Sequence, residues 1–191
     1  MPRVTTAFAA ALALFMPVGR PLLVGLTPVV GIGAGLLTTQ AAYSMSAEDW
    51  FDSGVAKAKR GDWQGAIAAW TKVIEINPRF ADAYSNRGVA KDELEDYQAA
   101  IADFNKAIEI KPRDADVYYN RGNAKGELKD YQGAIADYTK AIQINPALRQ
   151  AYINRGIDLE IVGDPQGACS DWRKAVDLGH PYAIAWVRKN C

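Results

Sequence analysis

The phrase Asn-Arg-Gly returns three times at an interval of 34 residues, and this repetition constrains the fold more than any other feature of the chain. The phrase stands in YSNRG at 84–88, YYNRG at 118–122 and YINRG at 152–156. Three prolines keep the same interval: Pro78, Pro112 and Pro146. Aligned on these prolines, the chain divides into the units 47–80, 81–114, 115–148 and 149–182. A period of this size is typical of solenoids, in which each unit buries its apolar face against its neighbours.

Each unit also carries residues of one kind at four further positions. The fourth position is aromatic, the eighth is Gly, the twentieth is Ala and the twenty-fourth is again a large aromatic residue. In the second unit these residues are Tyr84, Gly88, Ala100 and Phe104. Apolar residues between them recur at spacings of three and four, with a break near Glu95-Asp96. The pattern predicts two amphipathic helices per unit, A and B, that approach closely where the small residues lie.

These positions closely resemble the tetratricopeptide repeat (TPR) family, from about Ala47 onward. The resemblance implies an all-α, right-handed solenoid of four helix-turn-helix units over 45–182, with a concave groove lined by the A helices. It also implies a non-enzymatic adaptor that binds another protein. The stretch NRGNAKGELKDYQGAIADYTKAIQINP is similar to TPR proteins of cyanobacteria and chloroplasts. That similarity implies the periplasm or thylakoid lumen, and a role in assembling a membrane or photosynthetic complex.

The fourth unit departs from the pattern at both ends of its B helix. Pro165 replaces a tyrosine, and His180 stands where the other units have their proline. Asp164 followed by Pro165 is a favourable N-cap and first-turn pair. The remaining residues, 181–191, predict a capping helix that begins near Pro181 and covers the last unit with Ile184 and Trp186–Val187.

The first 44 residues have a different composition and contain no Asp or Glu. Two apolar runs, Ala7–Val18 and Pro21–Leu37, flank Arg20 and are followed by small residues suited to signal-peptidase cleavage at Ala41–Ser44. The segment fits a signal peptide better if translation starts at Met16, because Arg20 then supplies the charged region and Pro21–Leu37 the apolar region. The segment is a cleaved signal peptide or an uncleaved membrane anchor. Cleavage is favoured because the second run is short for a span and rich in Gly and Pro.

Arginine of the repeated phrase occupies position seven, and an aspartate occupies position twenty-three. The first unit lacks both, with Ser53 and Ala69 in their places. The two positions lie at similar distances from the A–B turn, so they face each other in an antiparallel hairpin. We therefore expect structural ion pairs within units two to four, namely Arg87–Asp103, Arg121–Asp137 and Arg155–Asp171.

Asparagine of the phrase is the stronger candidate for contact with a partner. In the TPR family its position lies on the inner side of helix A, where a ladder of amides can hold an extended peptide backbone. A solvated helix face with no ligand explains the asparagines equally well. The predicted groove residues are Asn86, Asn120, Asn154, Val55, Val89, Tyr119, Asn123, Asp82 and Asp116. Further acids, Asp92 and Glu127 among them, favour a partner with basic and apolar residues.

Two cysteines predict one disulfide. Cys169 lies eleven residues before the turn at His180, and Cys191 lies eleven residues after it. Antiparallel helices would bring the two together, and an oxidising compartment would let them bond. The alternative is that Cys169 is a small buried apolar residue, since the other units have Ile at its position.

Composition excludes several other functions. The formal net charge is zero, so the chain as a whole has no strong electrostatic attraction for nucleic acid. One histidine and two cysteines are too few for a structural zinc site, and no cofactor or catalytic motif occurs. His180, between Gly and Pro in a turn, is not expected to be catalytic. Membrane contact is expected only through an uncleaved N-terminal segment. A monomeric adaptor is the first hypothesis, and a self-associating module without a peptide ligand is the second.

Overall fold

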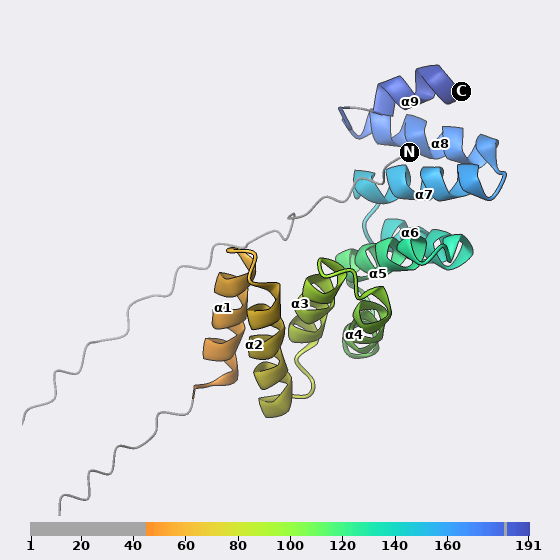
Figure 1. Cartoon of the computed structure of the whole chain (residues 1–191). Coiled ribbons are helices and arrows are strands. Elements are labelled where there is room, and N and C mark those ends of the chain that lie inside the picture. Colours follow the sequence, from red (N-terminus) through yellow and green to blue (C-terminus); the bar gives the residue numbers. More distant parts are fainter. Residues whose placement is uncertain (1–44, 182) are drawn as a thin grey trace, which may run out of the picture. The chain divides into compact units, whose positions relative to one another are not determined.

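The computed structural model describes residues 45–181 and 183–191 (Figure 1), and the signal-peptide or anchor prediction for 1–44 lies outside these residues. The described part is all-α, as the 34-residue period predicts. The A helices are α1 (Ala47–Ala58), α3 (Ala81–Asp92), α5 (Ala115–Glu127) and α7 (Arg149–Ile161). The B helices are α2 (Trp63–Ile76), α4 (Tyr97–Ile110), α6 (Tyr131–Ile144) and α8 (Pro165–Asp177), and α9 (Ala183–Asn190) follows. Each helix packs on the next along the chain, and each pair A–B makes one repeat unit (Figure 1).

Aspartates begin all four B helices. Each accepts a hydrogen bond from the backbone N–H three residues on, which satisfies one of the free donors of the first turn. The four N-caps are Asp62, Asp96, Asp130 and Asp164. The residue before Asp96 is Glu95, with φ 62°, so the chain reverses in a left-handed turn where the sequence pattern breaks. Pro165 lies in the first turn of α8, where its missing N–H costs no hydrogen bond.

Glycine at the eighth position is required by the aromatic residue at the twenty-fourth. A Cβ on Gly88 would lie 2.7 Å from the Phe104 ring, and one on Gly122 would lie 2.7 Å from the Tyr138 ring. Gly54 faces the Trp70 ring in the same way. Alanines at the twentieth position are fully buried beside these contacts. The core is therefore a row of glycine–aromatic contacts, one in each hairpin.

Helix α9 packs on α8 through Trp186, whose ring lies 6.3 Å from that of Trp172 and 6.2 Å from that of His180. The helix begins two residues later than Pro181. The expectation that Ile184 covers the last unit is wrong, because its side chain is 48% exposed. Two residues turn a helix by about 200°, so Ile184 and Trp186 cannot face α8 together.

A disulfide joins Cys169 of α8 to Cys191, with 5.7 Å between the Cα atoms. Cys169 is only 8% exposed, so the residue is both bonded and part of the buried layer. The Cys169 Sγ also lies 3.5 Å from the carbonyl oxygen of Asn190. The end of the chain is thus tied to the last B helix by a covalent bond as well as by the tryptophan contact. No helix among the described residues is long and apolar enough to cross a bilayer.

Candidate functional site

The arginine of the repeated phrase binds the aspartate sixteen residues later in the same unit. Arg121 donates from Nε to one carboxylate oxygen of Asp137 at 2.8 Å and from Nη2 to the other at 2.6 Å. Arg87–Asp103 and Arg155–Asp171 have the same two-bonded geometry. The aspartates are buried and the arginines half-buried. Hydrogen bonding to Asp103 raises the pKa of Arg87, so the guanidinium remains charged.

A lysine that the sequence analysis overlooked completes two of these sites. Lys91 lies 2.7 Å from Asp103, and Lys125 lies 2.8 Å from Asp137. Both lysines occupy position eleven, one helical turn after the arginine, so they reach the same carboxylate. The fourth unit has Leu159 there instead. Lysine also stands at position eleven of the first unit, as Lys57, where position twenty-three is Ala69 and the lysine lies 3.5 Å from Asp62 instead. The sequence pattern alone therefore did not single out the lysines that reach the buried aspartates.

The arginine also ties each unit to the one before. Arg87 donates to Thr71 Oγ1 at 3.0 Å, and Arg155 donates to Thr139 Oγ1 at 2.9 Å. Arg121 reaches Asn105 Oδ1 in the same way. Each guanidinium also lies 5.5–5.8 Å from the centre of the tyrosine ring at the fourth position. The arginine is therefore a structural tie within and between units, and not an accessible binding group.

The three asparagines of the phrase do not form a uniform ladder. Asn86 and Asn120 are half-buried, and neither amide has a hydrogen-bond partner within the described part of the chain. Asn154 is 2% exposed and donates to Tyr119 Oη at 3.2 Å and Asn123 Oδ1 at 2.8 Å. Asn123 is therefore also engaged, and its Oδ1 accepts from Tyr138 Oη at 2.8 Å as well. The prediction that Asn154 is available to a partner is wrong, because it is used to join units three and four.

The predicted apolar groove residues also lie closer to the core than expected. Tyr119 is 7% exposed and packs against Tyr138, with 5.9 Å between the ring centres. Val55 and Val89 are half-buried and pack against buried clusters that each span their own unit and the next. The prediction that Tyr119 faces a ligand is wrong. Its hydroxyl and ring are needed for the contact with α6 and α7, and this arrangement could not be deduced from the repeat alone.

What remains accessible is a polar, acidic surface on two neighbouring A helices. It is made by positions two, six and thirteen, which lie on one side of a helix because they are four and seven residues apart. We call it the α3–α5 face, made of Asp82 and Asn86 on α3, Glu93 directly after α3, and Asp116, Asn120 and Glu127 on α5. Helices α3 and α5 contact each other directly. Asp82 has one exposed neighbour of opposite charge, Lys111, at 3.5 Å.

Carboxylates crowd this face closely enough to perturb one another. Burial in the first place, and then the charges of Glu93 and Glu127, raise the pKa of Asp92 to about 7. Burial and the charge of Asp114 likewise raise the pKa of Asp116, against the opposing effect of Lys111. The attraction of a cationic group to this face comes from its exposed carboxylates, such as Asp82, Glu93 and Asp116, and not from these shifts.

Together, the repeated hairpins, the internal arginine ties and the accessible A-helix face define a repeat scaffold for protein–protein interaction. Comparison of the sequence with family models then identifies the repeat. Models of the tetratricopeptide repeat match residues 115–148, and also 54–91 and 93–129. The chain is thus a TPR protein, and proteins of this kind are generally scaffolds rather than enzymes.

Solved structures of other TPR proteins resemble this chain. A crystal structure of MamA is 28% identical, with a TM-score of 0.67 over 69% of this chain and 77% of that one. The Arabidopsis OM64 TPR domain is 29% identical, with a TM-score of 0.60 over 61% of this chain and 96% of that one. PilF of Pseudomonas aeruginosa shares the fold at 23% identity, with a TM-score of 0.68 over 75% of this chain and 66% of that one. No curated protein sequence matches significantly.

Proposed function

We propose that this chain is an exported TPR adaptor whose α3–α5 face binds a partner segment with basic and apolar residues. The observation that carries the proposal is the pair of unpartnered amides, Asn86 and Asn120, held one unit apart among carboxylates. An amide can donate to and accept from a peptide backbone. The surrounding acids add selectivity for a cationic segment and a faster encounter with it.

Binding should be tested with a short labelled peptide in which Lys alternates with Leu, followed by fluorescence anisotropy. We expect a dissociation constant on the order of micromolar that rises with salt concentration. Replacing Asn86 and Asn120 together by Ala should weaken binding by about tenfold, since each amide supplies roughly one net hydrogen bond. Asn154 is left intact, because its loss would disturb the contact between units.

The matched control replaces Gln98 and Gln132 by Ala. These are exposed amides in the first turns of α4 and α6, so the control removes the same chemical groups from B helices. Its affinity should equal that of the wild type. Equal loss in both double variants, or no loss in either, would rule out the α3–α5 face as the site.

Export is supported by the acid-free N-terminal 44 residues, by the small residues before Ser46 and by the disulfide. N-terminal sequencing of protein from its native source should find a mature end between Ala42 and Ser46. An intact Met1 or Met16 on cytoplasmic protein would contradict export.

The repeat sequence is similar to that of TPR proteins of cyanobacteria and chloroplasts, which supports a role in assembling a membrane or photosynthetic complex. A deletion strain would test this role through the amounts of assembled complexes.

A further inference from the structure

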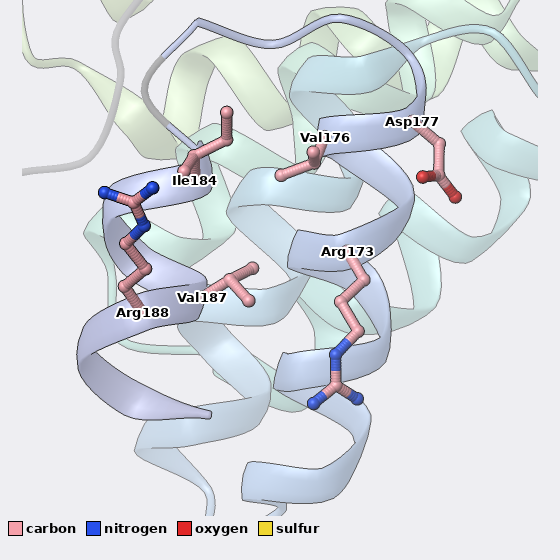
Figure 2. Close-up of a pocket in the computed structure, with 6 residues that line it drawn as sticks. All are labelled: Arg173, Val176, Asp177, Ile184, Val187 and Arg188. Atoms are coloured by element: carbon pink, nitrogen blue, oxygen red, sulfur yellow. The ribbon is translucent and has the colours of Figure 1, made fainter.

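A second surface, with the opposite charge preference, lies between the last two helices. It is an open hollow of about 480 Å³ lined by Arg173, Val176, Asp177, Ile184, Val187 and Arg188, which Figure 2 shows. Val176 of α8 and Val187 of α9 lie between the two helices at its centre (Figure 2). We call it the α8–α9 hollow. It is separate from the α3–α5 face, because its residues come from the fourth unit and the capping helix.

The floor of the hollow is apolar and only partly covered. Val176 and Val187 are half-buried, and Ile184 is among the most exposed large apolar side chains of the described residues. Trp186 already makes the capping contact with α8, so Ile184 is not needed for it. The hollow therefore leaves apolar surface available next to charged groups, which is typical of an interaction site.

Its charges are basic and not satisfied within the protein. The side chains of Arg173 and Arg188 are exposed, and neither has an ion-pair partner among the residues that the structure describes. Exposed Lys174 and Lys189 follow them on the same two helices, whereas Asp177 is the one acid of the lining. A guanidinium can bind a carboxylate through two hydrogen bonds, so this rim favours an acidic partner.

Position twenty-five shows how the hollow differs from the repeat. In units one to three this position holds Thr71, Asn105 or Thr139, each of which accepts a hydrogen bond from the arginine of the next unit. In the fourth unit it holds Arg173, and no further Asn-Arg-Gly phrase follows it in residues 174–191. The fourth unit therefore has a positively charged side chain, Arg173, where the other units have a hydrogen-bond acceptor. Its helices meet no repeat arginine from a following unit, so no acceptor is needed there.

We propose that the α8–α9 hollow binds an acidic segment of a partner protein that inserts an apolar side chain between Ile184, Val187 and Val176. A second copy of the chain is a poorer fit, because a two-fold contact would place the four arginines of two hollows against each other. A flat anionic membrane would meet the arginine tips but would leave the concave apolar floor unfilled. Since the disulfide and Trp186 already hold α9 in place, binding needs no ordering of this helix.

The test is fluorescence anisotropy of the full chain with a short labelled peptide in which Glu alternates with Leu. We expect binding in the range of tens of micromolar. Arg173→Glu with Arg188→Glu should weaken it by about tenfold or more, and Ile184→Ser alone should weaken it several-fold. All three residues are exposed, so circular dichroism should show an unchanged helical fold. The control Arg60→Glu with Arg79→Glu, two exposed arginines of the first unit, should bind as the wild type does.

Several results would overturn the proposal. These are no binding by the wild type, equal loss in the Arg60/Arg79 control, or equal affinity for a peptide with Ser in place of Leu. Concentration-dependent dimerisation that Arg173→Glu with Arg188→Glu abolishes would assign the hollow to a second copy. Sedimentation with phosphatidylglycerol vesicles that the same variant abolishes would assign it to a membrane. Binding of the Lys–Leu peptide should be unaffected by this variant, so failure here is distinguishable from failure of the α3–α5 face.

Discussion

At the scale of single residues, the three members of Asn-Arg-Gly have separate tasks. Glycine leaves room for an aromatic ring, and arginine joins two helices of its own unit and one of the preceding unit. Asparagine is accessible in units two and three and buried in unit four. A repeated residue therefore need not have a repeated function, because its surroundings differ between the middle and the end of the array.

Arg121 and Asp137 should show a strong energetic coupling. Each alanine substitution is expected to lower the free energy of unfolding by about 1–3 kcal/mol, since each leaves a half-buried or buried charge without its best partner. Asp137→Ala should cost more, because it also removes the partner of Lys125. The double variant should cost less than the sum, by about 1 kcal/mol or more, in urea unfolding.

An exposed ion pair provides the control for this double-mutant cycle. Lys106 and Glu109 lie 2.6 Å apart on α4, with both side chains more than half exposed. Their alanine substitutions should add within about 0.5 kcal/mol, as is usual for surface pairs. Strict additivity for Arg121 and Asp137 as well would contradict a structural role of the buried pairs.

Asp92 should make stability depend on pH. Its pKa is raised from 3.8 to about 7, so the folded state binds the proton more tightly than the unfolded state. The contribution of Asp92 to the free energy of unfolding is therefore greatest below about pH 4 and falls as the pH rises to about 7, by at most about 1.4 kcal/mol per pH unit. Asp92→Asn should stabilise the protein more at pH 8 than at pH 5 in urea unfolding. Asp52→Asn, at an exposed site on α1, is the control and should show no such difference.

At the scale of elements, α9 shows how a short helix can end a repeat array. Eight residues are too few to form a stable helix alone, so α9 depends on its contacts with α8. One contact is apolar, through Trp186, and the other is the disulfide. The α8–α9 hollow lies beside this contact, where Ile184 lines it and remains 48% exposed.

Cys191→Ser should loosen α9 and leave the other helices unchanged. Closing a loop of 22 residues stabilises by about 3 kcal/mol on the entropic account, and the loss should fall on the capping helix. Hydrogen exchange should become faster in residues 183–190 but not in α3 to α6. Reduction of the wild type with dithiothreitol should have the same effect. Unchanged protection of α9 in both cases would show that Trp186 holds the helix without the disulfide.

At the scale of the whole molecule, arginine hydrogen bonds join each of the first three units to the next. Neither end of the array has the group needed for a further bond of this kind. The first unit lacks the arginine, with Ser53 in its place, and the last lacks the acceptor, with Arg173 in its place. Two chains stacked end to end would therefore place Ser53 near Arg173 and would lack the bonds that join neighbouring units. The surface charge also changes along the array, from the acidic α3–α5 face to the basic α8–α9 hollow.

We accordingly expect residues 45–191 to be monomeric when expressed without the N-terminal 44 residues. Sedimentation equilibrium at concentrations up to about 100 µM should give the mass of one chain, since an end-to-end contact would lack the arginine hydrogen bonds that join neighbouring units. Arg173→Thr restores the acceptor found in the first and third units and serves as a comparison. A stable dimer of the unaltered protein would favour the self-associating module.

Much of the fold could be predicted from the sequence because equivalent positions of the four units lie in similar surroundings and so carry the same kinds of residue. The interval of 34 residues, Gly opposite an aromatic residue and Arg opposite Asp all follow from contacts inside one hairpin. Such contacts join two residues at a fixed separation in the sequence, one on each antiparallel helix. A repeat shows the same pair at the same separation in several units, so the pair can be recognised from the sequence. The pairing of Cys169 with Cys191 follows from the same geometry about one turn.

The exposure of each side chain was decided only by the tertiary structure. Asn86 and Asn154 occupy one position of the repeat, yet the first is accessible and the second is buried against Tyr119 and Asn123. Burial depends on which side chains the neighbouring units bring to that point, and these differ from unit to unit. Ile184 is exposed for the same reason, since the rotation of α9 is set by Trp186 and the disulfide. Sequence periodicity thus determined the hairpin and its internal pairs, whereas contacts between non-identical units determined which surface is left for a partner.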